Sequence, residues 1–491
     1  MKFRKSEDIF HLIGEADEAY LADARKGRAR PRTYRILIPL VAAMLATLLF
    51  VSGAFSIRNN WLLAPFETTG TTEGPFGDPL PFALTAAVRP LRAQYPTGEW
   101  DHNAYTAWSE EISTLRDEFR ALSALPTEFF EQSIAEFLSC DEAENRVYSP
   151  LNVYMALAML AETAGGESRA EILTLLGEDS IEDLRRTAST ILQTHHRDDG
   201  LSKTLLAASF WLRDGYNYKK VVLTQLAESY YADAFSGEMG SEAYNEALRG
   251  WLNEQTGGLL ADQIGNVELD SLTVIALATT LYFHAAWEQE FYEQNNTEEI
   301  FRGETGDVLT TFMHRTWNDT YYDGNGFSAV RLGLNSGGGM YLLLPDEGDS
   351  IADLLQNEAA LAILSAADTS GTESLYREIQ LSLPKFDVSS QIDLMKGLSN
   401  LGVRSALDRT RADFSPLTDQ KIWVTSATHG ARVMIDEKGC TGAAFTVIQV
   451  GDEGVPPQLP MVEFNVDRPF LFVVTSDVGV PLFVGAVNVV E

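Results

Sequence analysis

The chain has 491 residues, of which 45% are hydrophobic and 22% are charged, a composition that predicts a folded protein with a large core. It carries 37 Lys and Arg against 70 Asp and Glu, and its formal net charge of -33 argues against nucleic acid as a partner. The two cysteines, Cys140 and Cys440, exclude a disulfide framework and any Cys/His zinc motif.

The first predicted segments concern a membrane. Residues 1–35 mix basic and acidic side chains, and residues 36–57 then contain no charge and are long enough to cross a bilayer. Cations crowd the N-terminal side of this span, so the positive-inside rule predicts a cytoplasmic tail at 1–35, a transmembrane helix at 36–57 and an extracellular remainder. The alternative is a cleaved signal peptide and secretion, because Ser52, Gly53 and Ala54 would suit a peptidase.

The rest of the chain is predicted as a linker followed by a single domain. Residues 58–110 contain many Thr, Gly and Pro and indicate a flexible linker, and residues 111–491 form the domain. Periodic apolar patterns predict helices at 104–125, 127–138, 151–163 and 392–401, and strands at 274–282, 340–344, 470–475 and 482–490. Helices and strands mixed without a second linker indicate an α+β domain.

The stretch from Asp436 to Val450 has the features of both a strand and a loop. Cys440 to Val450 contain no charge and no proline, so this segment could enter the middle of a sheet. Small or apolar residues at alternate positions would share one face of such a strand. Gly439 on one side and the Gly- and Pro-containing residues 451–457 on the other indicate a loop instead, and these residues alone leave both alternatives open.

Short motifs occur in a fixed order from about residue 125 to residue 491. They are N-R-V-Y-S-P-L-N at 145–152, N-E-Q-T-G-G at 253–258, L-Y-F-H-A-A-W-E at 281–288, L-P-K-F at 383–386, A-D-F-S at 412–415, I-D-E-K-G-C at 435–440, D-R-P-F-L-F at 467–472 and L-F-V-G at 482–485. Together they resemble the serpins, a family of serine protease inhibitors. The resemblance implies an α+β serpin fold with three β-sheets, about eight or nine helices and an exposed reactive-centre loop.

The resemblance also implies an activity. The partner would be a target protease that cuts the reactive loop, forms a covalent acyl-enzyme and is trapped when the freed segment inserts into the central sheet as a strand. The expected protein is a monomer and an inhibitor rather than an enzyme, with no cofactor and no metal ion. The alternative is a non-inhibitory member of the fold that acts as a binding protein on the cell surface.

The family pattern assigns positions in the reactive loop. The hinge comprises Glu437, Gly439, Cys440, Gly442, Ala443 and Ala444, with Cys440 and Gly442 standing where other residues are usual. The family spacing from Glu437 places the reactive bond between Glu453 and Gly454, with Asp452 as the alternative reactive position. An acidic residue there suggests a Glu- or Asp-preferring serine or cysteine protease, because Arg or Lys in its pocket would bind the carboxylate. Cleavage at Val450 or Val455 is the alternative.

Further positions match residues that control opening of the sheet. Ser149, Asn152, Thr279 and His429 correspond to a buried polar cluster, in which Asn152 replaces a usual Ser and Thr279 a usual Asn. This pair would either preserve the hydrogen bonding by a compensating exchange or alter opening of the sheet. Trp287 matches an aromatic residue at the top of the sheet. Lys385 and Glu437 match an ion pair at the hinge, which we expect to contribute about 1 kcal/mol or less if exposed.

Enzyme motifs offer little support for another function. The sequence lacks GxSxG, HExxH and the common phosphate-binding glycine motifs. His195 and His196 are adjacent, but with no third ligand suggested nearby they indicate a solvated helix end rather than a metal site.

Overall fold

The computed structural model describes residues 82–90, 92–97, 100–122, 125–139, 144–265, 267–440 and 459–490. The predicted tail at 1–35 and span at 36–57 lie outside these residues. Within the described ranges, no helix combines the length and the apolar character needed to cross a membrane. The predicted single-pass membrane location is therefore withdrawn.

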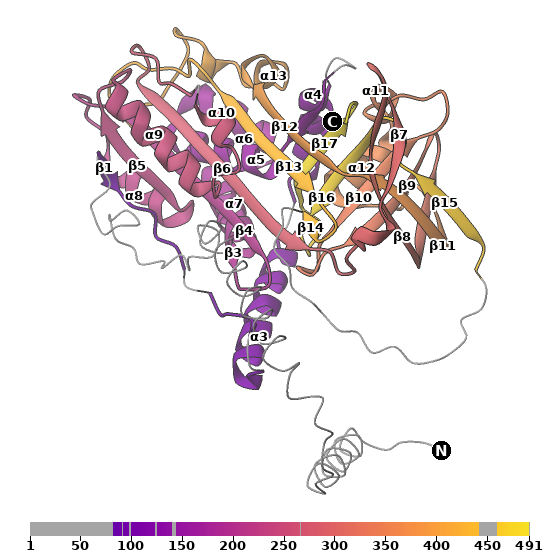
Figure 1. The fold of residues 1–491 in the computed structure, drawn as a ribbon. Coiled ribbons are helices and arrows are strands. Elements are labelled where there is room, and N and C mark those ends of the chain that lie inside the picture. Colours follow the sequence, from indigo (N-terminus) through magenta and orange to yellow (C-terminus); the bar gives the residue numbers. More distant parts are fainter. Residues whose placement is uncertain are drawn as a thin grey trace, which may run out of the picture. The chain divides into compact units, whose positions relative to one another are not determined.

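A large mixed sheet forms one half of the fold (Figure 1). Its strands follow the order β1 (Ala83–Thr85), β5 (Ala232–Gly237), β4 (Lys203–Arg213), β6 (Ile275–Ala286), β14 (Gly439–Cys440), β13 (Thr428–Ile435) and β12 (Phe386–Asp393), with β3 (Arg197–Asp198) paired to β4. Only the β4–β5 pair is parallel among these described strands. The two-residue strand β14 is the shortest member of the central part of the sheet, and it comes from the predicted hinge.

The second sheet is continuous where two separate sheets were expected. Its order is β15 (Met461–Asn465), β11 (Glu373–Pro384), β8 (Gly306–Gly324), β9 (Phe327–Gly333), β10 (Gly339–Pro345), β16 (Phe470–Thr475), β17 (Pro481–Val487) and β2 (Arg146–Tyr148), with β7 (Thr297–Gly303) paired to β8. The long strand β8 joins the parts, because its first residues pair with β7 and its later residues pair with β11 and β9. The described residues therefore form two sheets rather than three.

Helices cover both sheets. They are α3 (His102–Arg120), α4 (Thr127–Leu138), α5 (Pro150–Thr163), α6 (Gly166–Leu176), α7 (Ile181–His195), α8 (Lys220–Ser229), α9 (Glu242–Gln255), α10 (Ala261–Ile264), α11 (Ile351–Leu354), α12 (Glu358–Ala366) and α13 (Met395–Asn400), with short 3-10 turns η2 (Glu293–Asn295) and η3 (Ser405–Leu407). The predicted mixed architecture of helices and sheets is confirmed.

Helix α5 lies at the centre of the core. Ser149 caps its N-terminus by accepting a hydrogen bond from the backbone N–H of Asn152, and Pro150 occupies the first turn, where a missing donor costs nothing. Nearly every residue of α5 is buried, which explains why its apolar residues show little one-sided periodicity. The helix thereby holds Ser149 and Asn152 against the large sheet.

Two segments differ from the sequence prediction. The predicted helix at 392–401 is shorter, since Ile392 still belongs to the alternately buried strand β12, which ends at Asp393, and α13 begins only at Met395. The range 58–110, predicted as a linker, contains β1 and the start of α3. Strand β1 pairs with β5 and extends the edge of the large sheet, so this part of the N-terminal segment belongs to the folded unit.

Candidate functional site: the hinge in the large sheet

The first residues of the predicted insert are already paired within the large sheet. Gly439 and Cys440 of β14 lie opposite Ala286 and Ala285 of β6, and Cys440 lies opposite Ile435 of β13 on its other side. A tight turn brings the chain back from β13, in which the carboxylate of Asp436 accepts hydrogen bonds from the backbone N–H of Lys438 and Gly439 at 2.8 and 3.0 Å. The hinge therefore enters the sheet between β6 and β13.

Of the strands that the structure describes, only β14 lies between β6 and β13. Among the described residues, β6 pairs with β4 and β14, and β13 pairs with β12 and β14, while no ladder joins β6 directly to β13. We call this strand position, flanked by β6 and β13, the insertion position.

Close packing explains why a glycine stands at the start of β14. A Cβ atom on Gly439 would lie 2.4 Å from the carbonyl oxygen of Ala285 and 2.8 Å from the Cα of Ala286. These are backbone atoms of a central strand, which cannot turn aside as a flexible side chain could. Only glycine lets the hinge approach β6 this closely.

Glu437 is held by groups from several elements. Its Oε1 lies 2.5 Å from Nζ of Lys385, between β11 and β12, and the side-chain amide of Asn296 donates to the same oxygen at 2.5 Å. The backbone carbonyl of Glu437 also accepts a hydrogen bond from the N–H of Phe291 at 2.8 Å. Burial opposes ionisation of this carboxyl, yet the bonds from Lys385 and Asn296 hold the pKa of Glu437 below its ordinary value.

Trp287 lies directly beneath the turn of the hinge. Its indole N–H donates to the carbonyl oxygen of Asp436 at 2.9 Å, and its backbone N–H donates to the carbonyl of Lys438 at 2.8 Å. The side chain is buried and packs edge-on against Phe291. Trp287 thus fixes the backbone of the turn with both of its N–H groups.

A buried polar cluster lies below the sheet, where α5 meets β6 and β13. The hydroxyl of Ser149 donates to the carbonyl of Leu482 at 2.7 Å, and its backbone N–H donates to Nε2 of His429 at 3.0 Å. Because Nε2 accepts this bond, His429 is neutral, and burial lowers its pKa to about 4. The amide of Asn152 donates to Thr279 at 3.3 Å, but the acceptor is the backbone carbonyl and not the Thr279 hydroxyl. The hydrogen bond between Asn152 and Thr279 therefore does not depend on the Thr279 side chain.

Cys440 places a thiol inside this sheet. The side chain is 2% exposed and belongs to the main core, and burial raises its pKa to about 12. The thiol is therefore protonated and unreactive while the hinge stays in place. The remaining predicted loop residues, Gly442, Ala443, Ala444, Asp452, Glu453 and Gly454, lie outside the described residues.

His195 and His196 are buried, contrary to the solvated helix end predicted for them. The Nδ1 of His195 donates to the carbonyl of Ile191 at 2.7 Å, and its Nε2 lies 3.0 Å from the Ser476 hydroxyl. The Nδ1 of His196 donates to the carbonyl of Leu206. Burial lowers the pKa of His195 to about 4 and that of His196 to about 3, so both are neutral packing residues.

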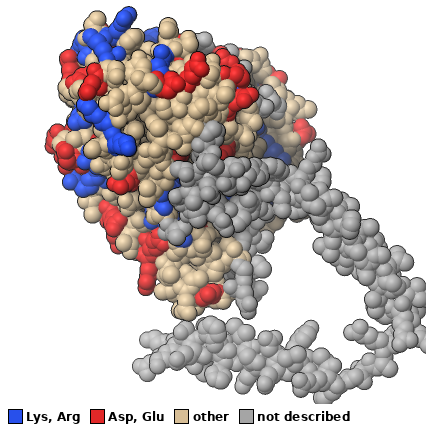
Figure 2. All heavy atoms as spheres, turned by 90° about the vertical axis from the view of Figure 1, so that its left-hand side faces the viewer, with Lys and Arg blue, Asp and Glu red and all other residues tan. Residues whose placement is uncertain are grey.

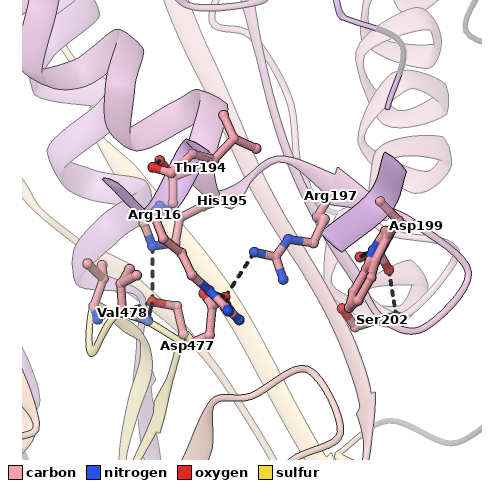
Figure 3. Close-up of polar contacts among 12 residues, drawn as sticks. Arg116, Thr194, His195, Arg197, Asp199, Ser202, Asp477 and Val478 are labelled. Carbon is pink, nitrogen blue, oxygen red and sulfur yellow. Dashed lines mark hydrogen bonds and ion pairs between the residues drawn. The ribbon is translucent and has the colours of Figure 1, made fainter. Parts of the chain in front are cut away.

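Sequence patterns did not indicate a charged cluster that joins the N-terminal segment to the core. Asp477, in the turn between β16 and β17, lies between two guanidinium groups: Arg116 of α3 at 2.6 Å and Arg197 of β3 at 3.0 Å (Figure 3). Burial opposes its ionisation, but these two arginines hold the pKa of Asp477 below its ordinary value. Contacts between residues so distant in the sequence leave no local periodic signal.

Comparison with known proteins decides the family. A family model described as serpin (serine protease inhibitor) matches residues 126–490. The chain belongs to the serpin family. Serpin-Z2B of Triticum aestivum is 27% identical over 396 residues, which cover 76% of this chain and 98% of that protein. Plasminogen activator inhibitor 1 of Bos taurus is 27% identical over 390 residues, covering 75% of this chain and 92% of that protein.

Solved structures agree on the serpin fold. The crystal structure of tengpin, a thermophilic serpin, in its native state matches with a TM-score of 0.65 at 23% identity and covers 82% of this chain and 98% of tengpin. The family match starts at residue 126, after β1 and α3. On the face of this serpin that Figure 2 shows, basic and acidic side chains are interspersed.

Proposed function

We propose that this serpin inhibits a protease by suicide cleavage of its reactive loop. The protease would form an acyl-enzyme with the loop, and the freed segment, residues 441–452, would insert between β6 and β13 and carry the trapped protease with it. The observation that supports this most directly is the placement of β14, which already lies between these two strands.

The energy for trapping would come from completing the large sheet. An inserted strand of about ten residues gains roughly ten backbone hydrogen bonds, each worth about 1 kcal/mol net. The intact loop would reach this state only slowly, because its C-terminal end continues into β15 of the second sheet. The uncut form is then kinetically trapped, and cleavage releases it.

The target proposed for the loop is a Glu- or Asp-preferring serine or cysteine protease. Family spacing from Glu437 places Glu453 before the cleaved bond and Gly454 after it, with Asp452 as the alternative. A pocket that presents Arg or Lys would bind either carboxylate through charge-assisted hydrogen bonds.

Thermal unfolding before and after loop cleavage tests the trap. About 10 kcal/mol of added stability corresponds to a rise in Tm of roughly 10–15 °C for a domain of this size. An SDS-stable complex with the cleaving protease is expected as well. Cleavage that leaves Tm unchanged and yields no complex would show a non-inhibitory serpin that acts by binding alone.

Variants of the loop test the specificity. Glu453→Arg is expected to transfer complex formation from Glu-cleaving enzymes to Arg-cleaving ones, whereas Glu453→Ala with Asp452→Ala should abolish complexes with acid-preferring enzymes. Glu463→Ala serves as the control, because Glu463 is an exposed glutamate on β15 beyond the loop. Complexes of the wild type with trypsin-like enzymes only would refute the acidic assignment.

A further inference from the structure

Residues 82–89 run along the outer edge of the large sheet, and we call them the edge segment. Strand β1, within this segment, pairs antiparallel with β5 at the end of the sheet (Figure 1). The contact continues on both sides of β1. The backbone N–H of Ser236 donates to the carbonyl of Phe82 at 2.9 Å, and the N–H of Val88 donates to the carbonyl of Ala227, on α8, at 3.1 Å.

A buried carboxylate on β5 holds the edge segment. The Oδ1 of Asp233 accepts a hydrogen bond from the backbone N–H of Ala87 at 2.9 Å. Its Oδ2 lies 3.4 Å from Nη2 of Arg89, and the indole N–H of Trp251, on α9, donates to the same oxygen at 3.2 Å. Asp233 is 8% exposed, so its charge depends on these donors. The edge segment supplies two of them.

Apolar contacts add to this recognition. The ring of Phe82 packs edge-on against Tyr244, with 5.1 Å between the ring centroids. Ala83 packs against the cluster that contains Tyr244 and Trp211, and Ala87 is buried in the main core. The edge of β5 therefore combines a backbone edge, an aromatic contact and a buried carboxylate, which is how an extended peptide is bound when it adds a strand to a sheet.

Other features of the edge segment weaken its hold on β5. Phe82 has a φ of 72°, in the left-handed region that is unfavourable for an aromatic residue. The register shifts between Ala83 and Thr85, which leaves the ladder irregular. Leu84 and Val88 are 50% and 58% exposed. The edge segment is thus bound at the β5 edge without the packing of a core strand.

The charges define what else fits this edge. If the edge segment leaves, Asp233 keeps only Trp251 among the donors described above, so a replacement must bring a backbone N–H and, two residues later, a cation. Residues 79–88 carry no charge and Arg89 follows them. Such a segment can approach a chain of net charge -33, which repels acidic segments. A second copy of the chain presents this same sequence.

We propose that the β5 edge is a strand-addition site, which the chain fills with its own edge segment and which takes the edge segment of a second copy when its own leaves. Asp233 selects the incoming segment through the Ala87 N–H and the Arg89 guanidinium. The exchange links two copies without changing the fold of either. It does not depend on protease inhibition.

A labelled synthetic peptide of residues 82–90, F-A-L-T-A-A-V-R-P, tests the site. It is added to the full-length variant Ala87→Pro with Arg89→Met, called the release variant, which lacks both donors to Asp233. Fluorescence anisotropy should show binding to the release variant at least about tenfold tighter than to the wild type, whose own segment competes at an effective concentration of about 1 mM. The same peptide with Arg89→Met should bind the release variant at least about tenfold more weakly.

Arg120→Met is the matched control. Arg120 is also an arginine of the N-terminal segment, but it is 68% exposed on α3 and pairs with Asp117, so this variant should bind the peptide as weakly as the wild type. The single variant Arg89→Met keeps the Ala87 N–H and should show intermediate affinity. Denaturant unfolding of each variant separates release of the edge segment from loss of the fold.

Mixing two full-length variants tests the exchange between copies. The release variant has an intact site and a defective segment, whereas Asp233→Asn has an intact segment and a weakened site. Light scattering after size exclusion should find monomers of each alone and a heterodimer in the mixture, which excess peptide disperses. Peptide binding without a heterodimer would overturn the exchange. Equal peptide affinities of the wild type and the release variant would overturn the site, and so would a heterodimer that forms equally well with Arg120→Met in place of the release variant.

Discussion

Gly439→Ala is expected to displace the hinge from the large sheet. Its new Cβ would lie 2.4 Å from a backbone oxygen and 2.8 Å from a backbone carbon of β6, and a clash of this kind costs about 1–3 kcal/mol if the hinge stays in place. If the hinge leaves instead, the protein loses the backbone hydrogen bonds of β14, at about 0.5–1.5 kcal/mol each, and the burial of Cys440. Either route lowers the free energy of unfolding of the intact form by about 2 kcal/mol.

Alkylation of Cys440 distinguishes displacement from a strained hinge. The raised pKa of about 12 and full burial protect this thiol in the wild type, so at pH 8 only about one thiol in ten thousand is ionised. Displacement should accelerate alkylation at Cys440 at least about tenfold, measured by mass spectrometry of the Cys440 peptide so that Cys140 does not interfere.

Gly250→Ala in α9 is the control for Gly439→Ala, since a Cβ there would meet no atom within 4 Å. This control should gain about 0.5–1 kcal/mol from the better helix propensity of alanine. If Gly439→Ala changes neither the stability nor the alkylation rate, the hinge is not packed against β6 as described.

Three further substitutions test the surrounding contacts. Asp477→Asn leaves Arg197, whose side chain is 8% exposed, without its charged partner and should lower the free energy of unfolding, measured in urea at pH 7, by about 3 kcal/mol. The stabilisation by Asp477 is present above the ordinary carboxyl pKa and is lost as pH falls through the lower folded pKa. The stabilities of the variant and the wild type should therefore converge in acid. The folded pKa of His429, about 4, lies below the ordinary value of 6.5. Its contribution to the free energy of unfolding is therefore full above pH 6.5 and falls toward pH 4 by up to about 1.4 kcal/mol per pH unit. His429→Gln should remove this contribution to the dependence of stability on pH. Glu437→Gln should lower the free energy of unfolding by about 1 kcal/mol, with a coupling to Lys385→Met of similar size in a double-mutant cycle; purely additive effects would contradict the ion pair.

Much of the fold could be predicted because the residues that determine each helix or strand are adjacent in the sequence. The apolar runs that become β6, β10 and β16, and the Ser149-Pro150 start of α5, carry their structure in adjacent residues. The end of β12, which includes Ile392, was predicted as the start of a helix. Its last residues, considered without the alternation that precedes them, resemble a helix start. The N-terminal elements β1 and α3 were partly hidden in a Thr-, Gly- and Pro-containing region, whose composition indicates a linker whatever it packs against.

The site was less accessible from the sequence, since its decisive contacts are long-range. Asn296 carries no signal in the sequence, and nothing near it indicates its hydrogen bond to the carboxylate of Glu437. The arrangement of Asn152 against the Thr279 backbone carbonyl likewise depends on how α5 packs beneath β6. Residue types at matching positions identify which side chains meet, whereas the atoms that bond follow only from the packing.

The register of β14 fixes which loop residues would face the core after insertion. Side chains alternate between the two faces of a strand, and Cys440 is buried. Continuing the strand from Cys440 places Gly442, Ala444 and Thr446 on the buried face, and Phe445 on the opposite face. Thr446→Glu should therefore block the rise in Tm after loop cleavage, because insertion would bury an unpaired carboxylate at a cost of several kcal/mol. Phe445→Glu, with the same new charge one residue away, should leave most of that rise intact, and equal effects of the two variants would show that insertion does not continue the register of β14.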